Sequence, residues 1–184
     1  MESITWASHD WHFDGIKKLQ LANLPSVIGA EEKLSQGFVT CDYDIEDLQE
    51  MNEPYPHVLA IDNNKVVGYA LVLLPRYKQI MPILLPMFVK IDEAMSTDHR
   101  VRGASYFVMG QICIDKHYRG QGLFYKLYDR MKAQMSVHYN LMFTEVSSLN
   151  KRSLRAHERQ GFKRLYTYTA LDGHEWVLIY WDWR

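Results

Sequence analysis

The stretch that says most about the fold is Ile112-Cys113-Ile114-Asp115-Lys116-His117-Tyr118-Arg119-Gly120-Gln121-Gly122-Leu123. Its first residues have the apolar pattern of a strand, and its two glycines come directly before a segment with helical periodicity. Glycines allow a tight turn that exposes successive N–H groups, and a helix N-terminus carries about half a positive charge. We therefore expect a phosphate-binding turn between a strand and a helix, to which Arg119 adds a cation.

This turn alone leaves two interpretations open, because glycines also occur in ordinary turns between a strand and a helix. Two other phosphate-binding motifs do not fit the sequence. A Walker A loop needs Gly-Lys followed by Ser or Thr at the start of the helix. The dinucleotide-binding fingerprint needs a third glycine where this chain has Tyr125.

Strand and helix patterns alternate on both sides of the turn, which predicts an α/β fold with a mixed sheet and helices on its faces. The predicted strands are Ile4–Ala7, His57–Ile61, Val66–Leu74, Tyr106–Ile114, Leu141–Val146, Leu165–Ala170 and Trp176–Trp183. The predicted helices are Trp11–Ala22, Ala30–Ser35, Ile45–Met51, Gly122–Ser136 and Lys151–Gln160. Residues 75–102 contain three prolines and no clean period, so we expect a long loop beside the substrate.

Length and composition are typical of one globular domain over residues 1–184, with 47% hydrophobic and 23% charged residues. A formal net charge of -1 argues against binding nucleic acid through its phosphates. Cys41 and Cys113 are far apart and lack metal-site spacing, so neither a disulfide framework nor a zinc site is expected. Without a signal peptide or an apolar run of roughly 20 residues, the sequence predicts a soluble, cytoplasmic protein with no membrane partner.

Two motifs in the second half of the chain resemble the GNAT N-acetyltransferase superfamily. Arg119-Gly120-Gln121-Gly122-Leu123-Phe124 resembles its acyl-CoA pyrophosphate loop, except that the family has Gly or Ala where this chain has Phe124. Downstream, the segment from Asn150 to Phe162 resembles a second family motif, which has an Asn, then a small residue, then a Tyr, and ends in Gly-Phe. In this chain the Asn is Asn150, the small residue is Ser153 and the last two residues are Gly161 and Phe162. Here His157 stands in place of the Tyr. The two motifs in this order favour the family over an ordinary turn and a plain helix cap.

The resemblance implies the GNAT fold, a mixed and mostly antiparallel sheet of about six to seven strands, splayed in the middle, with helices on both faces. It implies acetyl-CoA as cosubstrate and no metal. Backbone groups near Ile112 and Ile114 would contact the thioester and pantetheine, with a β-bulge near Gly110. The implied cofactor-binding residues are Ile112, Cys113, Ile114, Arg119, Gly120, Gln121, Gly122, Leu123, Phe124, Asn150 and Ser153.

The resemblance also implies two catalytic residues. Glu145 lies five positions before Asn150, where related ribosomal-protein N-terminal acetyltransferases have a general base. Such a base is needed because a lysine-like amine has a pKa of about 10.4 and is mostly protonated at neutral pH. His157 would donate a proton to the leaving thiolate. A solvated strand carboxylate and an ordinary helix histidine are the alternative interpretations of these two residues.

The implied activity is direct transfer of an acetyl group to an amine in a ternary complex, with a small molecule favoured over a protein as acceptor. An acetyl-cysteine at Cys113 is not expected, because no activating base is signalled nearby. The departures at Phe124 and His157 leave a catalytically silent acyl-CoA-binding module as the alternative. The aromatic residues of the last strand fit either a homodimer interface or a filled core, and they are Trp176, Tyr180, Trp181 and Trp183.

Overall fold

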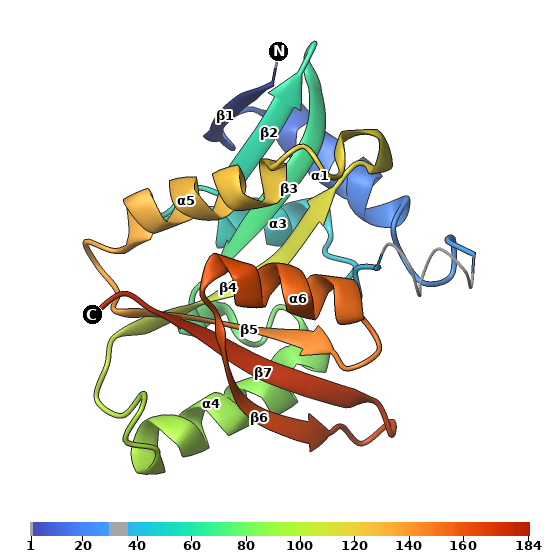
Figure 1. Cartoon of the computed structure of the whole chain (residues 1–184). Coiled ribbons are helices and arrows are strands. Elements are labelled where there is room, and N and C mark those ends of the chain that lie inside the picture. The colour runs from blue at the N-terminus through green and yellow to red at the C-terminus, as the bar shows by residue number, and fades with distance from the viewer. Residues whose placement is uncertain (1, 30–36) are drawn as a thin grey trace.

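The computed structural model describes residues 2–29 and 37–184 and has a seven-stranded sheet at its centre (Figure 1). The strand order is β1-β2-β3-β4-β5-β7-β6. All neighbouring strands are antiparallel except β4 and β5, which are parallel. The predicted mixed, mostly antiparallel α/β architecture is therefore confirmed.

Each predicted strand is present, with small shifts at its ends. The strands are β1 (Ser3–Trp6), β2 (Val58–Asp62), β3 (Lys65–Leu73), β4 (Tyr106–Ile114), β5 (Leu141–Ser147), β6 (Lys163–Thr169) and β7 (Glu175–Asp182). The α-helices in the described residues are α1 (Asp10–Leu21), α3 (Ile45–Met51), α4 (Leu85–Thr97), α5 (Leu123–Met135) and α6 (Lys151–Gln160). The helix predicted over Ala30–Ser35 lies outside the described residues.

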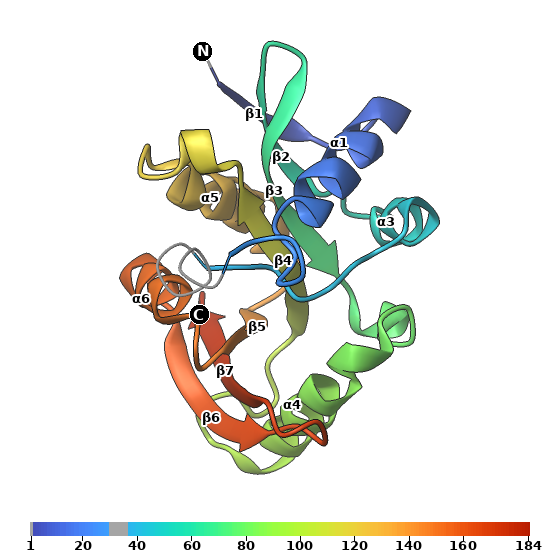
Figure 2. The same ribbon diagram turned by 90° about the vertical axis from the view of Figure 1, so that its right-hand side faces the viewer.

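Helices cover both faces of the sheet, as Figure 2 shows. One face packs against α5 and α6, and the other against α1, α3 and α4. Side chains of a strand alternate between the two faces. On β5, Phe143 therefore belongs to the core under α4, whereas Met142 and Val146 belong to the core under α5 and α6.

The expectation of a long loop over residues 75–102 is wrong, because α4 occupies its second half. Pro86 lies in the first turn of α4, where a missing N–H breaks no helical hydrogen bond. The buried residues of α4 follow helical spacing, and they are Met87, Phe88, Ile91 and Ala94. The prolines that suggested a loop thus lie at the start of the helix or in the short 3-10 turns Pro75–Tyr77 and Pro82–Leu84 before it.

The sheet splays between β4 and β5. These strands pair only where Tyr106–Val108 lies beside Leu141–Phe143, and both continue beyond that point without pairing. On the other side of β4, Leu71 pairs with Gln111 and Val72 with Met109, so Gly110 is an extra residue. The predicted bulge near Gly110 and the splay in the middle of the sheet are both confirmed.

The aromatic residues of β7 fill the core of a single chain. Trp176, Tyr180 and Trp181 are all buried, and β7 lies between β5 and β6 rather than at an edge. These side chains therefore give no reason to expect a dimer, which stays a prediction. Within the described residues, no helix has both the length and the apolar character that crossing a membrane requires.

Candidate active site

The predicted phosphate-binding turn has the backbone of an anion site. Gly120 and Gly122 both have a φ of +79°, and a Cβ on either would meet no atom within 4 Å. Glycine is therefore needed for backbone conformation and not for space. Gly122 is the N-cap of α5, and the structure shows no hydrogen-bond acceptor among the described residues for the amides of Gly122, Leu123 or Phe124. These amides are therefore available to donate to an anion or to water.

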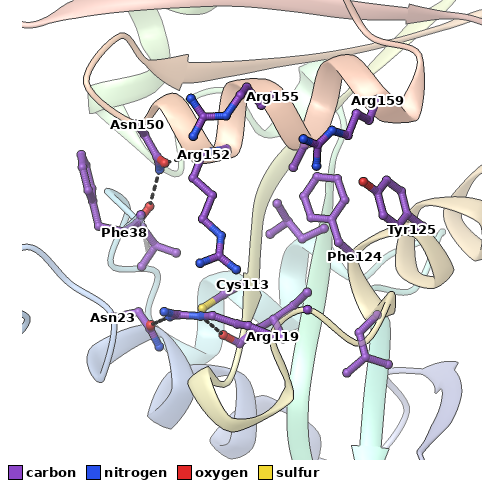
Figure 3. Close-up of a pocket in the computed structure, with 18 of the residues that line it drawn as sticks. Asn23, Phe38, Cys113, Arg119, Phe124, Tyr125, Asn150, Arg152, Arg155 and Arg159 are labelled. Atoms are coloured by element: carbon purple, nitrogen blue, oxygen red, sulfur yellow. Dashed lines mark hydrogen bonds between the residues drawn. The ribbon is translucent and has the colours of Figure 1, made fainter. Parts of the chain in front are cut away.

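A cavity of about 550 Å³ lies against this turn, between α5 and α6 (Figure 3). The predicted cofactor residues that line it are Ile112, Cys113, Ile114, Arg119, Gly120, Gly122, Leu123, Phe124, Asn150 and Ser153. Gln121 does not line it, because its exposed side chain donates to the carbonyl of His117 at 3.0 Å. The fold thus brings the two sequence motifs to opposite walls of one cavity.

Arginines gather around the same cavity. Arg152, Arg155 and Arg159 reach it from α6, and Arg119 reaches it from the turn (Figure 3). The Arg119 side chain is fixed by bonds to the Ile114 carbonyl at 3.1 Å and to Asn23 Oδ1 at 2.6 Å. These three arginines of α6 are not among the predicted cofactor-binding residues, although their spacing places all of them on one helical face. This basic lining suits a ligand with several phosphate charges.

Asn150 has a structural role as well as a place in the cavity wall. Its Oδ1 accepts from the Ser153 amide at 3.1 Å, so Asn150 caps α6. Its Nδ2 donates to the Phe38 carbonyl at 3.4 Å, which ties the start of α6 to the chain before α3. A contact of Asn150 or Ser153 with a cofactor stays a prediction.

Phe124 fills space beside α6 and not beside the backbone amides. Its ring packs edge-on against Tyr128, with centroids 4.9 Å apart, and against His157, with centroids 5.1 Å apart. The bulky side chain at this motif position therefore leaves the N–H groups of the turn open. It narrows the cavity on the α6 side, where it is one of the lining residues.

The splay leaves one edge of β4 open towards the cavity. Asp115 donates its amide to the Val67 carbonyl of β3 at 2.9 Å. Because backbone groups alternate in direction along a strand, those of Ile112 and Ile114 point to the opposite edge. Arg119 accordingly binds the Ile114 carbonyl there. The backbone of Ile112 lies in the same wall, consistent with its predicted contact with pantetheine.

A second, smaller recess of about 70 Å³ adjoins the first cavity and contains Glu145. The two spaces share several lining residues: Phe38, Val39, Ile112, Asn150 and Ser153. The remaining wall is mostly apolar and includes Leu84, Met87, Met109 and Trp176. The fold therefore places the predicted base next to the end of the predicted cofactor cavity.

Glu145 is half-buried and lines the recess. Burial raises its pKa to about 7, against a smaller lowering by a hydrogen bond from the Tyr168 hydroxyl to Oε2. A group that titrates near neutral pH is suited to accept a proton and release it again. Such a position and pKa suit a general base, and the catalytic role of Glu145 stays a prediction.

His157 is buried, and both of its ring nitrogens are hydrogen-bonded. Nδ1 lies 2.8 Å from the Ser153 carbonyl, which can only accept, so Nδ1 carries the proton. Nε2 then accepts from the Tyr128 hydroxyl at 2.6 Å. Burial lowers the His157 pKa to about 4, so the ring is neutral at pH 7. These contacts give His157 a structural role, and proton donation to a thiolate stays a prediction.

Neither cysteine is an activated nucleophile. Burial raises the pKa of both thiols to about 12. Cys113 lines the large cavity and Cys41 the small recess, each as a neutral thiol. Nowhere in residues 2–29 and 37–184 do three or more His, Cys, Asp or Glu side chains gather as metal ligands.

Two buried neutral histidines are expected to make the fold sensitive to acid. Burial lowers the pKa of His57 and His157 from 6.5 to about 4. Between these values the unfolded chain binds more protons, so stability falls as the pH falls, by about 3 kcal/mol for each histidine. Glu145 acts in the opposite direction, because its raised pKa favours the folded state as the pH falls from about 7 to 4.5. We therefore expect the free energy of unfolding to fall by about 3 kcal/mol in total between about pH 7 and pH 4.

Urea unfolding at a series of pH values measures this loss. In Glu145→Gln the opposing contribution of Glu145 is absent, so the same acidification is expected to lower the free energy of unfolding by about twice as much. A free energy of unfolding that stays constant or rises on acidification would contradict the neutral, buried state of both histidines.

Comparisons with solved structures agree with this fold. The Escherichia coli ribosomal-protein-S18-alanine N-acetyltransferase superposes with a TM-score of 0.63 at 12% identity, covering 99% of this chain and 94% of that one. The NatC complex bound to Gag peptide and CoA gives 0.66 at 16% identity, covering 98% of each chain. The yncA protein of Salmonella typhimurium, a proposed acetyltransferase solved with acetyl-CoA, gives a TM-score of 0.66 at 15% identity, covering 100% of this chain and 94% of that one. At these identities the likeness shows a shared fold.

The family model gives the assignment that structural likeness alone does not. No curated protein sequence matches the chain significantly. The model of the acetyltransferase (GNAT) family matches residues 28–162, a range that includes the glycine turn, Glu145 and the α6 motif. With that match over more than half of its length, the chain belongs to the GNAT acetyltransferase family.

Proposed function

We propose that the protein transfers the acetyl group of acetyl-CoA directly to an amine, with both substrates bound at once. The observation that carries this proposal is the junction of two cavities. One has open backbone amides and arginines suited to phosphates, and the other has a carboxyl group with a pKa of about 7. An acetyl donor and an amine in these two spaces would meet where the walls are shared.

The residues of the large cavity fit coenzyme A. The amides of Gly122, Leu123 and Phe124 would bind the pyrophosphate at the N-terminus of α5. Arg152, Arg155 and Arg159 supply further charge for phosphate oxygens. The open edge of β4 at Ile112 would bind the pantetheine arm. Acetyl-CoA supplies the activated acetyl group as a thioester.

Glu145 would take a proton from the acceptor amine, which reacts only as the neutral base. A backbone N–H on the open edge of β4 would stabilise the negative charge that develops on the acetyl oxygen. Thiols titrate at about 8.5, so the departing thiolate does not depend on a side-chain acid. That fits a site in which the His157 nitrogens are already bonded.

A small-molecule amine is the acceptor that we favour. The recess at Glu145 has a volume of about 70 Å³ and mostly apolar walls, including Leu84, Met87 and Trp176. Such a space suits a compact group next to the amine. A protein N-terminus is the second candidate. One solved structure with this fold is named for ribosomal-protein alanine, and another is bound to a peptide. A single catalytic domain over residues 1–184 and a cytoplasmic location are further parts of this proposal.

A catalytically silent coenzyme A sensor is the alternative function. It is favoured by one observation, that His157 replaces the family tyrosine and has both nitrogens engaged. Such a module would bind coenzyme A through the same turn and would not use Glu145.

Calorimetry and a thiol-release assay separate these functions. We expect coenzyme A to bind, and thiol release from acetyl-CoA to rise when members of a panel of primary amines and N-terminal peptides are added. Binding without acceptor-dependent release across the panel would favour the sensor. Absence of any coenzyme A binding would contradict both functions.

A further inference from the structure

The Glu145 carboxylate is held by one side chain from a distant part of the sequence. The Tyr168 hydroxyl donates to Oε2, and among the described residues it is the only hydrogen-bond partner of this carboxyl group. Within those residues Oε1 has no such partner, and Glu145 lines the small recess. Of the two carboxylate oxygens, Oε2 is thus hydrogen-bonded to Tyr168, whereas Oε1 can accept a further hydrogen bond or a proton.

A β-bulge places Tyr168 where it can make this contact. Glu145 of β5 lies opposite Leu178 of β7, and Leu178 lies opposite Tyr166 of β6. Between Arg164 and Tyr166 the register of β6 shifts by one residue. Without that shift, the side chains of β6 beyond the bulge would point to the other face of the sheet. The bulge therefore brings Tyr168 to the same face as Glu145, across the intervening β7.

Among the described residues, the other groups that line the recess at Glu145 include no cation to balance its negative charge. The strap before α3, which is the segment of residues 38–44, contributes Cys41 and Tyr43. Both side chains are neutral because burial raises their pKa values. Helix α6 contributes His157, which is neutral as well. The described residues of β4, β7, α4 and the turn before α4 contribute uncharged side chains to the recess: Met109, Gln111, Trp176, Met87 and Leu84. Within the part of the chain that the structure describes, Tyr168 is thus the side chain that supports the ionised form of Glu145.

We propose that Tyr168 is a positioning residue for the general base: its hydroxyl orients the Glu145 carboxylate and keeps it ionised, so that Oε1 can receive the proton of the acceptor amine. This inference rests on the proposed function. In the transfer, the amine nitrogen bonds to the acetyl carbon, the carbon–sulfur bond breaks, and the amine proton moves to Glu145. The sulfur leaves as a thiolate, and Tyr168 keeps its own proton throughout.

The Tyr168→Phe variant tests the proposal by removing one oxygen atom. The carboxyl group of Glu145 is followed by carbon-13 NMR in protein labelled at the glutamate side chains, and its resonance is assigned by its loss in Glu145→Gln. The wild-type resonance is expected to titrate near pH 7. In Tyr168→Phe the midpoint is expected to rise by about one unit or more, because a hydrogen bond to a charged group is lost. The low-pH limb of kcat/KM is expected to shift by the same amount.

Tyr166→Phe is the matched control. Tyr166 lies two positions away on β6, and its hydroxyl donates to Asp98 Oδ2 at 3.1 Å instead of to Glu145. This variant is expected to leave both the carboxyl titration and the pH profile of kcat/KM unchanged. It loses the same atom from the same strand, so it reports any general effect of weakening β6.

Two results would overturn the proposal: an unchanged Glu145 titration in folded Tyr168→Phe, or an equal shift in Tyr166→Phe. The NMR titration needs no acceptor substrate, so it remains decisive if the acceptor is unknown. If the titration moves as expected while Glu145→Gln keeps full turnover, the hold of Tyr168 on the carboxylate is supported and the proposed base is refuted. The two failures are therefore distinguishable.

Discussion

Replacing Gly122 with glutamate is expected to abolish measurable binding of coenzyme A. The new carboxylate would lie at the N-terminus of α5, where three amides have no acceptor among the described residues and where we propose that the pyrophosphate binds. Two like charges about 4 Å apart repel by about 4 kcal/mol near a protein surface, which corresponds to roughly a thousandfold in affinity. The φ of +79° adds strain for any residue with a Cβ. Titration calorimetry with coenzyme A measures the loss.

Gly173→Glu is the matched control for this substitution. Gly173 has a φ of +83° and open space at its Cβ, so it has the same backbone requirement. It lies in the exposed turn between β6 and β7, and it does not line either cavity. We expect Gly173→Glu to cost some stability and to bind coenzyme A like the wild type. Equal affinity of Gly122→Glu and the wild type would contradict the proposed phosphate site.

The sheet is largely predictable from the sequence because its strands are short, rich in apolar, β-branched or aromatic residues, and separated by clear turn residues. The strand β3 shows this best, since all but its first residue are buried on one face or the other. The helix α4 is not predicted, because Pro82 and Pro86 indicate a loop. The helical spacing of the buried apolar residues begins directly after them. Proline at a helix start and proline in a loop look alike when only local sequence is read.

The candidate site is predictable to the extent that its parts are contiguous in sequence. The turn at Gly120 and Gly122 and the cap at Asn150 belong to local motifs, and the structure brings them to one cavity. Tyr168 could not be predicted in the same way. Its contact with Glu145 depends on the strand order β5-β7-β6 and on a one-residue bulge, neither of which leaves a local signal.

The ionisation of Glu145 also depends on tertiary structure. A glutamate in an isolated strand would titrate near its ordinary pKa of about 4.3 and would be a weak base at neutral pH. Enclosure by the strap before α3, by α4 and by β7 raises its pKa to about 7. The same burial that forms the recess therefore makes its carboxyl group a better match to an amine proton.

Glu145→Gln is accordingly expected to lower kcat by about a hundredfold or more, the usual contribution of a general base. The amide keeps the shape of the side chain and cannot take a proton, so coenzyme A affinity is expected to stay at the wild-type value. The rise of kcat/KM around pH 7, which reports ionisation of Glu145, is expected to disappear. Glu175→Gln, which changes an exposed glutamate at the start of β7, is the control and should retain full turnover. Steady-state rates across the pH range test this prediction. An unaltered rate and pH profile in Glu145→Gln would mean that the amine loses its proton to water and that the recess only binds the acceptor.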